Sequence, residues 1–230
     1  MILYVIVFSC QANRGCEIAV ERVKLGHGIV LYCCAWTLCH IEGELNMRLL
    51  LHVCCAPDAA APFEILRDET WEEVTGYFHG SNIHPEDEYR RRADALKFLS
   101  ERYDINVLPC SYNPDSWFAA ASHLAGEPER GKRCAVCFSL QLRAAAEEGV
   151  KRGASHLGTT LTISPHKDAA LISRLGMEIA GQAGLVWEGR IWRKNNGFLR
   201  SVQISKELRL YRQSYCGCIY SKQSTINNES

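Results

Sequence analysis

Three close pairs of cysteines stand far apart along the sequence: Cys54-Cys55, Cys134-Ala-Val-Cys137 and Cys216-Gly-Cys218. Each pair offers two sulfurs within a few residues. A fold that brings two pairs together supplies four thiolates, which is the ligand set of an iron–sulfur cluster or of a closed zinc site. The third pair is then left for another task, so the sequence predicts a metal or redox centre.

The first two pairs allow three interpretations. Buried apolar thiols are the simplest, because free cysteine packs as a small hydrophobe, but two close pairs beside strand and helix ends are hard to obtain from packing alone. Zinc is the second, although the vicinal pair Cys54-Cys55 suits a compact tetrahedral site less well than a spacer of about two to four residues. A cluster has separate iron corners for neighbouring sulfurs, so we favour a cluster.

The Cys216-Gly217-Cys218 pair differs because its spacer is a single small residue. Such a spacing permits a strained, reducible disulfide, and strained disulfides are the catalytic or regulatory ones. In the competing interpretation, these two sulfurs hold a further metal ion together with Asp58. The residues alone do not separate the two alternatives. Cys110 stands alone after a predicted strand, and we expect it in the core.

Hydrophobic patterns predict which elements position these groups. Strands are expected at 48–53, 74–79, 105–108, 156–160 and 185–187, and helices at 59–67, 86–103, 115–124, 134–152 and 167–183. Strands and helices alternate, which predicts a Rossmann-like α/β fold, a mostly parallel sheet with helices on both faces. A ligand site in such a sheet lies at the carboxyl ends of the strands, where Cys54 and Cys55 fall.

The second pair stands at the start of a predicted helix. Cys134 and Cys137 are three residues apart, so both sulfurs project to one side. The helix N-terminus, with Lys132 and Arg133, is expected to favour the thiolate form. Asp58 is expected to cap helix 59–67. No glycine-rich phosphate loop follows the first strand, so the sequence gives no support for nucleotide binding.

Length and composition indicate one main domain. The chain has 230 residues and 47% hydrophobic content, enough for a well-buried core. Its twelve cysteines do not form the short, loop-rich pattern of a secreted disulfide framework, so we expect a reduced, cytoplasmic setting. The apolar residues 1–8 lack a preceding basic residue and are too few to span a bilayer, so no membrane partner is expected.

Domain bounds follow from the same patterns. Residues 1–46 show no clear periodicity, and Met47 opens the first predicted strand. We therefore interpret 1–46 as a non-native or disordered N-terminal extension, 47–222 as the catalytic α/β domain, and 223–230 as a flexible tail.

Charge is uneven although the formal net charge is zero. Basic residues gather in 190–222, where Glu207 is the single acidic residue; they are Arg190, Arg193, Lys194, Arg200, Lys206, Arg209, Arg212 and Lys222. This stretch indicates an anion-binding face. The alternative is a solvated surface whose acidic partners stand elsewhere in the sequence.

Five motifs make the sequence resemble the QueH family of epoxyqueuosine reductases. They cover about residues 47–222 in order: LHVCCAPD at 51–58, SNIHPEDEY at 81–89, EPERGKRCAVCF at 127–138, TTLTISPHK at 159–167 and YRQSYCGC at 211–218. The resemblance implies a two-electron, cobalamin-independent removal of the epoxide oxygen of epoxyqueuosine at the tRNA wobble position. It also implies an electron donor, whose identity the sequence does not give.

The resemblance further implies roles for the cysteines. Cys54, Cys55, Cys134 and Cys137 would hold a 4Fe-4S cluster, and Cys216 with Cys218 would form a redox-active dithiol. Some relatives have cysteine where this chain has Asp58, so Asp58 becomes a candidate oxygen ligand to an additional iron ion.

The remaining functional groups are assigned from chemistry. Proton donors are needed for this reaction, and the candidates are His52, Tyr112 and His166. The basic stretch would contact anticodon-loop phosphates, and the candidates for stacking on splayed bases are Tyr211, Tyr215, Trp187 and Trp192. Each of these residues also has a purely structural interpretation. Two alternative functions remain, a zinc-stabilised tRNA-binding module and a general thiol–disulfide oxidoreductase.

Overall fold

The computed structural model describes residues 5–9, 17–21 and 47–223, and it divides into two units, residues 1–43 and residues 44–230. In the first unit, β1 (Val5–Ser9) pairs antiparallel with β2 (Glu17–Glu21). The rest of 1–46, and 224–230 of the predicted tail, lie outside the described residues. The interpretation of 1–46 as an extension and of 223–230 as a tail stays a prediction.

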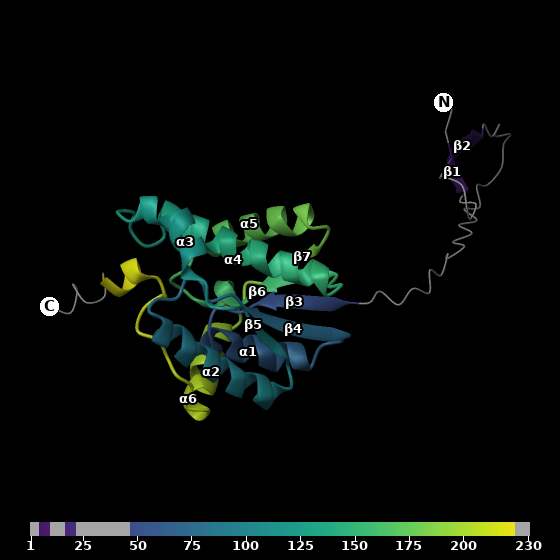
Figure 1. The fold of residues 1–230 in the computed structure, drawn as a ribbon. Coiled ribbons are helices and arrows are strands. Elements are labelled where there is room, and N and C mark those ends of the chain that lie inside the picture. The colour runs from purple at the N-terminus through teal and green to yellow at the C-terminus, as the bar shows by residue number, and fades with distance from the viewer. Residues whose placement is uncertain (1–4, 10–16, 22–46, 224–230) are drawn as a thin grey trace. The chain divides into compact units, whose positions relative to one another are not determined.

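The second unit is built on a five-stranded sheet (Figure 1). Its strands are β3 (Arg48–His52), β4 (Glu73–Phe78), β5 (Val107–Pro109), β6 (His156–Thr159) and β7 (Val186–Glu188). They lie in the order β5-β4-β3-β6-β7, and every neighbouring pair is parallel. This confirms the predicted α/β fold.

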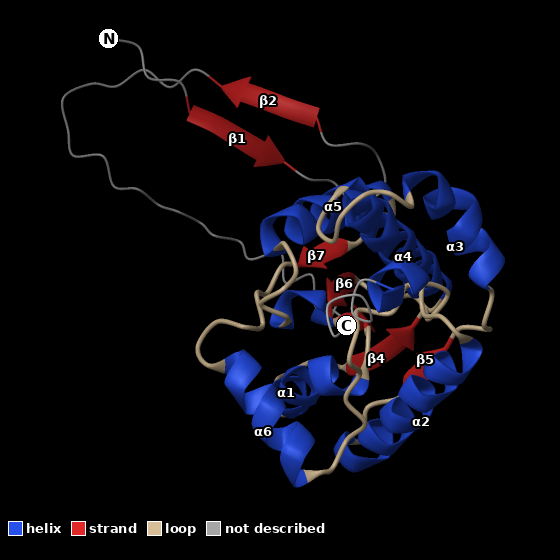
Figure 2. Cartoon of the chain, turned by 90° about the vertical axis from the view of Figure 1, so that its left-hand side faces the viewer, coloured by secondary structure: helices blue, strands red, loops and turns tan. Residues whose placement is uncertain are grey.

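Helices cover both faces of the sheet (Figures 1 and 2). One face carries α1 (Ala56–Arg67), α2 (Glu86–Tyr103) and α6 (Gly197–Glu207), and the other carries α4 (Lys132–Lys151) and α5 (Ala169–Gln182). The shorter α3 (Pro114–Ala121) packs on α4, and two 3₁₀ helices, η1 (Ser122–Leu124) and η2 (Thr160–Ile163), follow α3 and β6. Among the described residues, no helix is long and apolar enough to cross a bilayer.

The central strand shows why the sheet needs two helical layers. Leu49 and Leu51 pack into a cluster that includes Phe63 of α1, whereas Leu50 packs into a second cluster with Leu142 of α4. Successive side chains of a strand point to opposite faces, so a continuous apolar run is expected where both faces are covered. All three leucines are at most 1% exposed.

Helix α6 was not predicted. It lies in the basic stretch 190–222, where charged residues dominate the pattern. Its buried face consists of small or apolar residues, including Ser201 and Ile204, and it packs against α1. The Ser201 hydroxyl accepts a hydrogen bond of 3.1 Å from the backbone N–H of Ala61. Three of its four buried residues are glycine or serine, so the buried face shows little of the apolar repeat from which a helix is predicted.

Candidate functional site

The topology of the sheet opens a crevice beyond the carboxyl end of β3. From β3 the chain builds β4 and β5 on one side and later β6 and β7 on the other, so helices leave the sheet in opposite directions beside β3. Such a reversal of strand order is where open α/β sheets bind ligands. Cys54 and Cys55 lie in the loop between β3 and α1, at this position.

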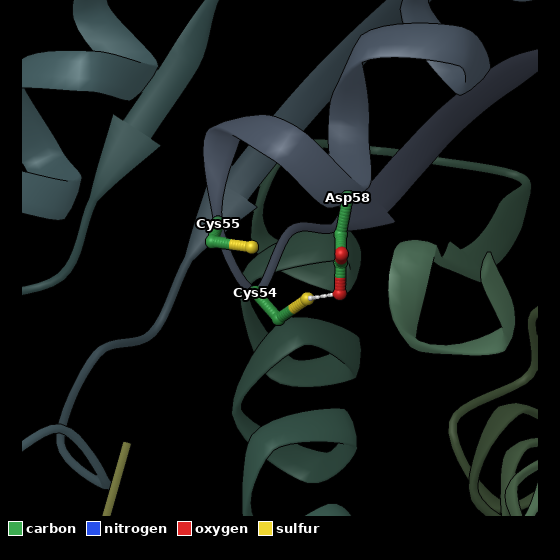
Figure 3. A group of neighbouring side chains, drawn as sticks. All are labelled: Cys54, Cys55 and Asp58. Atoms are coloured by element: carbon green, nitrogen blue, oxygen red, sulfur yellow. Dashed lines mark hydrogen bonds between the residues drawn. The ribbon is translucent and has the colours of Figure 1, made fainter. Parts of the chain in front are cut away.

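Asp58 does not cap α1, contrary to our prediction. The helix begins at Ala56 with Cys55 in the N-cap position, because Pro57 is tolerated in a first turn where backbone N–H groups have no helical partner. The Asp58 carboxylate instead accepts a hydrogen bond of 3.0 Å from the Cys54 thiol (Figure 3). The ligand atoms of Cys54, Cys55 and Asp58 all lie within 4.8 Å of one another, which suits a metal ion with mixed sulfur and oxygen ligands.

The second cysteine pair lies in the first two turns of α4. The Cys134 sulfur accepts a hydrogen bond of 3.3 Å from the backbone N–H of Arg130, and the Cys137 sulfur accepts one of 3.1 Å from the Gln141 amide. Burial raises the pKa of both thiols, which opposes the thiolate form that the helix N-terminus was expected to favour. The charge of Arg133 lowers the pKa of Cys134, but burial outweighs it.

Five of the six paired cysteines line one cavity, which we call the inner cavity. Its volume is about 30 Å³, and the five are Cys54, Cys134, Cys137, Cys216 and Cys218. Cys55 is buried beside Cys54 and accepts a hydrogen bond of 3.1 Å from the Gln213 side chain. The structure therefore brings together three cysteine pairs that are distant in the sequence. Cys110 lies elsewhere, against the core cluster of Leu50 and Leu142, as predicted.

Lys167 is a functional candidate to which the sequence argument gave no role. Its ammonium lies 3.2 Å from an Asp58 carboxylate oxygen and 3.9 Å from the Cys54 sulfur, with 15% of the side chain exposed. Burial alone would lower the pKa of Lys167, but the charges of Cys54 and Asp58 outweigh burial and raise it. The one sequence signal was its place at the end of the TTLTISPHK motif, four residues after the run 160–163, which is buried here.

A second cavity, the outer cavity, adjoins the inner one. Its volume is about 380 Å³, and it shares Cys134, Lys167 and Cys216 with the inner cavity. Its other walls include Phe198, the first-turn residue of α6, and the exposed Arg212. Because the outer cavity is wide and reaches exposed side chains, it offers a path from solvent to the thiols.

Of the three predicted proton donors, one lies at these cavities. His166 is exposed and lines the outer cavity. His52 is fully buried, its Nδ1 lies 2.9 Å from the Thr159 hydroxyl, and burial lowers its pKa to about 3. Its Nε2 has no hydrogen-bond partner within the described residues. Tyr112 packs on the core with its hydroxyl 3.5 Å from the His84 ring. His52 and Tyr112 line neither cavity.

Part of the basic stretch makes structural contacts, in line with the alternative interpretation, and the anion-binding face stays a prediction. Arg190 pairs with Glu69 at 2.7 Å and Arg200 with Glu64 at 2.6 Å, so the acidic partners stand far away in the sequence. The Arg193 guanidinium donates to the backbone carbonyl groups of Ser164 and Lys167, both at 3.1 Å. Arg212 is the member of the stretch that lines the outer cavity.

The predicted stacking aromatics are also mostly structural. Trp192 is 3% exposed and donates its indole N–H to the Thr159 carbonyl at 2.9 Å. Trp187 packs so closely on Gly176 that a Cβ there would lie 2.2 Å from the indole ring. The Tyr211 hydroxyl donates to Glu88 at 2.6 Å. Of the four candidates, Tyr215 lines the outer cavity.

Comparison with known proteins gives one consistent result. The family described as "Epoxyqueuosine reductase QueH" matches residues 49–224. Proteins named epoxyqueuosine reductase QueH are 38% identical in Streptococcus pyogenes, over 77% of this chain and 71% of the relative, and 35% identical in Acinetobacter baylyi, over 77% and 82%. The Thermotoga maritima relative is 34% identical over 75% of this chain and 89% of its own.

Among solved structures, the fold is similar to that of the U34-tRNA thiolase NcsA from Methanococcus maripaludis, described with its [4Fe-4S] cluster. The TM-score is 0.51 at 11% sequence identity, over 80% of this chain. The chain spans 64% of the length of the thiolase chain, and this likeness concerns the fold.

Proposed function

Because the chain belongs to the QueH family of epoxyqueuosine reductases and is an oxidoreductase, we propose how its residues carry out the reduction. Its substrate is tRNA with epoxyqueuosine at the wobble position, and its product is queuosine. Cys216 and Cys218 supply the two electrons. The observation that carries this proposal is that both thiols face the same cavity as Cys54, Cys134 and Cys137.

The chemistry balances with one dithiol. Removal of the epoxide oxygen breaks two C–O bonds, forms a C=C bond and consumes two electrons and two protons, and the oxygen leaves as water. Oxidation of two thiols to a disulfide releases two electrons and two protons. One turnover therefore converts the Cys216 and Cys218 thiols to a disulfide, and an external reductant of the dithiol or electron-carrier class must reduce it again.

The residues fit a metal centre. Cys54, Cys55, Cys134 and Cys137 would hold a 4Fe-4S cluster, since thiolates are its ligands, and Asp58 would add a carboxylate oxygen for an additional iron ion. The fit rests on the donor atoms, because Cys54, Cys55 and Asp58 lie within 4.8 Å of one another and Cys54 also faces Cys134 and Cys137 across the inner cavity. When bound, such a centre supplies electron storage and Lewis-acid polarisation of the epoxide oxygen.

Lys167 contributes a fixed positive charge at the junction of the two cavities. Its ammonium has three N–H donors, of which one is directed at Asp58 and one at the Cys54 sulfur. The third donor can bond the epoxide oxygen as negative charge develops on it, and such preorganised donors stabilise transition states strongly in partly buried sites.

The outer cavity receives the modified nucleoside. For the modified base to react inside a pocket, its nucleotide must leave the base stack of the anticodon loop. Aromatic side chains of the protein can then stack on the base. Phe198 and Tyr215 are the aromatic residues of this cavity besides Phe138, which the inner cavity shares. The exposed Arg212 is placed to contact the phosphate groups of the anticodon loop.

The test is metal analysis followed by turnover of the full-length chain purified without oxygen. We expect iron and acid-labile sulfide, a broad visible absorption that bleaches on reduction, and conversion of epoxyqueuosine tRNA to queuosine tRNA. Cys134→Ala should lose the absorption and the activity, while the control Cys110→Ala, whose thiol lies against the core, should keep both. Zinc without a visible absorption would contradict the cluster, and full activity of Cys134→Ala would contradict the site.

A further inference from the structure

A buried ion pair on α2 contacts the backbone of the Cys216-Gly217-Cys218 segment. Arg92 and Glu88 are one helical turn apart, and each side chain is 2% exposed. The Arg92 Nε donates to a Glu88 carboxylate oxygen at 2.8 Å. Neither residue lines the inner or the outer cavity. The pair is therefore close to the dithiol segment without access to substrate.

The other donors of the guanidinium are directed at the dithiol segment itself. One terminal nitrogen of Arg92 donates to the backbone carbonyl of Cys216 at 2.9 Å, and the other donates to that of Tyr215 at 3.1 Å. The guanidinium also lies 5.5 Å from the centre of the Tyr215 ring. A planar group with fixed donors thus holds two consecutive carbonyl groups in one orientation.

The loop before α2 makes further contacts with the same segment. The Gly217 carbonyl accepts a hydrogen bond of 2.8 Å from the backbone N–H of His84, and the Tyr215 hydroxyl donates to the His84 carbonyl. Gly217 has a positive φ of 148°, and an added Cβ there would lie 3.4 Å from an Arg92 nitrogen. The segment therefore has little freedom to change its backbone while Arg92 is in place.

Stability alone does not explain the pair. Burying two charges costs desolvation energy, and replacing a buried pair with apolar residues is often neutral or stabilising. What the pair adds is orientation, because Glu88 fixes Arg92 and Arg92 fixes the carbonyl groups beside Cys216. Glu88 is fixed in turn by the Tyr211 hydroxyl at 2.6 Å.

We propose that Arg92 is a positioning residue that holds Cys216-Gly217-Cys218 in the conformation with two separate thiols, and thereby shifts the thiol–disulfide equilibrium of this pair toward the dithiol. Both cysteines are free in this conformation. A disulfide between residues two apart demands a specific backbone geometry, and any change of backbone at Tyr215 and Cys216 disturbs the hydrogen bonds of Arg92. The inference rests on the proposed role of this pair as the electron source.

The redox step is a simple exchange with glutathione. Two thiols lose two protons and two electrons as the S–S bond forms, and one molecule of oxidised glutathione takes them up and becomes two molecules of reduced glutathione. Trypsin cleaves after Arg212 and Lys222, and the resulting peptide Gln213–Lys222 contains Cys216 and Cys218 as its only cysteines. Alkylation followed by mass spectrometry of this peptide therefore reports the equilibrium of this pair alone.

The test compares full-length variants in a series of glutathione buffers without oxygen. The double variant Glu88→Gln with Arg92→Met removes both charges together, which avoids a buried unpaired carboxylate. Arg92→Lys keeps the charge but cannot span both carbonyl groups. The matched control is Arg90→Ala, because Arg90 is exposed and pairs with Glu86 on the same helix. Far-ultraviolet circular dichroism establishes that each variant is folded.

The expected result is a shift toward the disulfide. At the glutathione ratio that oxidises half of the wild-type peptide, a tenfold change would leave about 90% of the double-variant peptide oxidised, and Arg92→Lys should move in the same direction. Arg90→Ala should coincide with wild type. Folded variants with the wild-type midpoint would overturn the inference while leaving the proposed function intact. A wild-type peptide that forms no disulfide at any ratio would instead overturn the dithiol role itself.

Discussion

The β3–α1 loop and the C-terminal segment, residues 208–218, bring thiols to the same inner cavity by different means. Cys54 and Cys55 are placed by regular structure, since one strand ends and one helix begins beside them. The C-terminal segment contains no helix or strand, and its backbone is held by side chains of α2 and by the loop before α2. The proposed roles fit this difference, because a rigid scaffold suits metal ligands, whereas hydrogen bonds to the backbone of the C-terminal segment can set the geometry of a proposed redox pair.

The sharpest test of this difference is to remove one thiol from each region. We expect Cys54→Ala to lose both iron and turnover, because Cys54 is a proposed cluster ligand and lies beside Cys55 and Asp58. Cys218→Ala is expected to lose turnover and keep its iron. Iron analysis and single-turnover conversion of epoxyqueuosine tRNA measure both quantities. Loss of iron in Cys218→Ala would show that the C-terminal segment also ligates metal.

Replacing Lys167 tests how far turnover depends on its positive charge beside Cys54 and Asp58. Replacing it with Met should lower kcat/KM by about 10²- to 10³-fold, because a preorganised donor to the epoxide oxygen is lost. Lys167→Arg should recover part of this loss, since it keeps the charge beside Asp58. Steady-state kinetics with epoxyqueuosine tRNA provide the measurement, and Lys151→Met, at the far end of α4, is the control. Unchanged kinetics in Lys167→Met would leave Lys167 a structural partner of Asp58.

His84, whose backbone N–H bonds the Gly217 carbonyl of the C-terminal segment, should make the free energy of unfolding depend on pH. Burial lowers the pKa of His84 to about 4, and His84 stacks on Phe118 with ring centres 4.6 Å apart. The unfolded state then binds more protons than the folded state below about pH 6.5, so the free energy of unfolding falls as the pH decreases toward 4. Between pH 7.5 and 5.5 this contribution amounts to about 1 kcal/mol.

Urea unfolding at these two pH values measures the effect. His84→Gln should reduce the difference between the two free energies of unfolding, and the exposed His123→Gln should not. An equal pH dependence in His84→Gln and wild type would mean that His84 is protonated as readily in the folded state as in the unfolded one.

The smallest expected effect is on RNA binding and concerns Arg212, the residue of the C-terminal segment that we propose contacts phosphate groups. Arg212→Glu should weaken binding of an anticodon stem-loop RNA and reduce the slope of log K against log salt by about 1, as for the loss of one phosphate contact. Arg209→Glu, which also carries an exposed side chain but lies outside the outer cavity, is the matched control. Fluorescence anisotropy over a range of salt concentrations measures both. Equal slopes in the two variants would remove Arg212 from the RNA contact.

Part of the fold could be predicted because the signals are local. The strands around β3 are apolar runs, and the helices show apolar residues at helical spacing. These patterns predicted the alternation of strands and helices along the chain, and from it a mostly parallel sheet. Helix α6 escaped prediction because its buried face consists mostly of glycine and serine rather than apolar residues. The expected thiolate state of Cys134 failed for a different reason, since a helix terminus is a local feature while burial, which raises its pKa, is not.

The sequence by itself determined the alternation of strands and helices, the three cysteine pairs and the motifs of the family. Only the tertiary structure decided which groups meet. Lys167 contacts Asp58 across 109 residues of sequence, and Arg92 contacts the Cys216 carbonyl across 124. Arg190 likewise pairs with Glu69 and Arg200 with Glu64, each more than a hundred residues away. Such contacts depend on how helices pack on the two faces of the sheet, and packing is a property of the whole chain rather than of any local pattern.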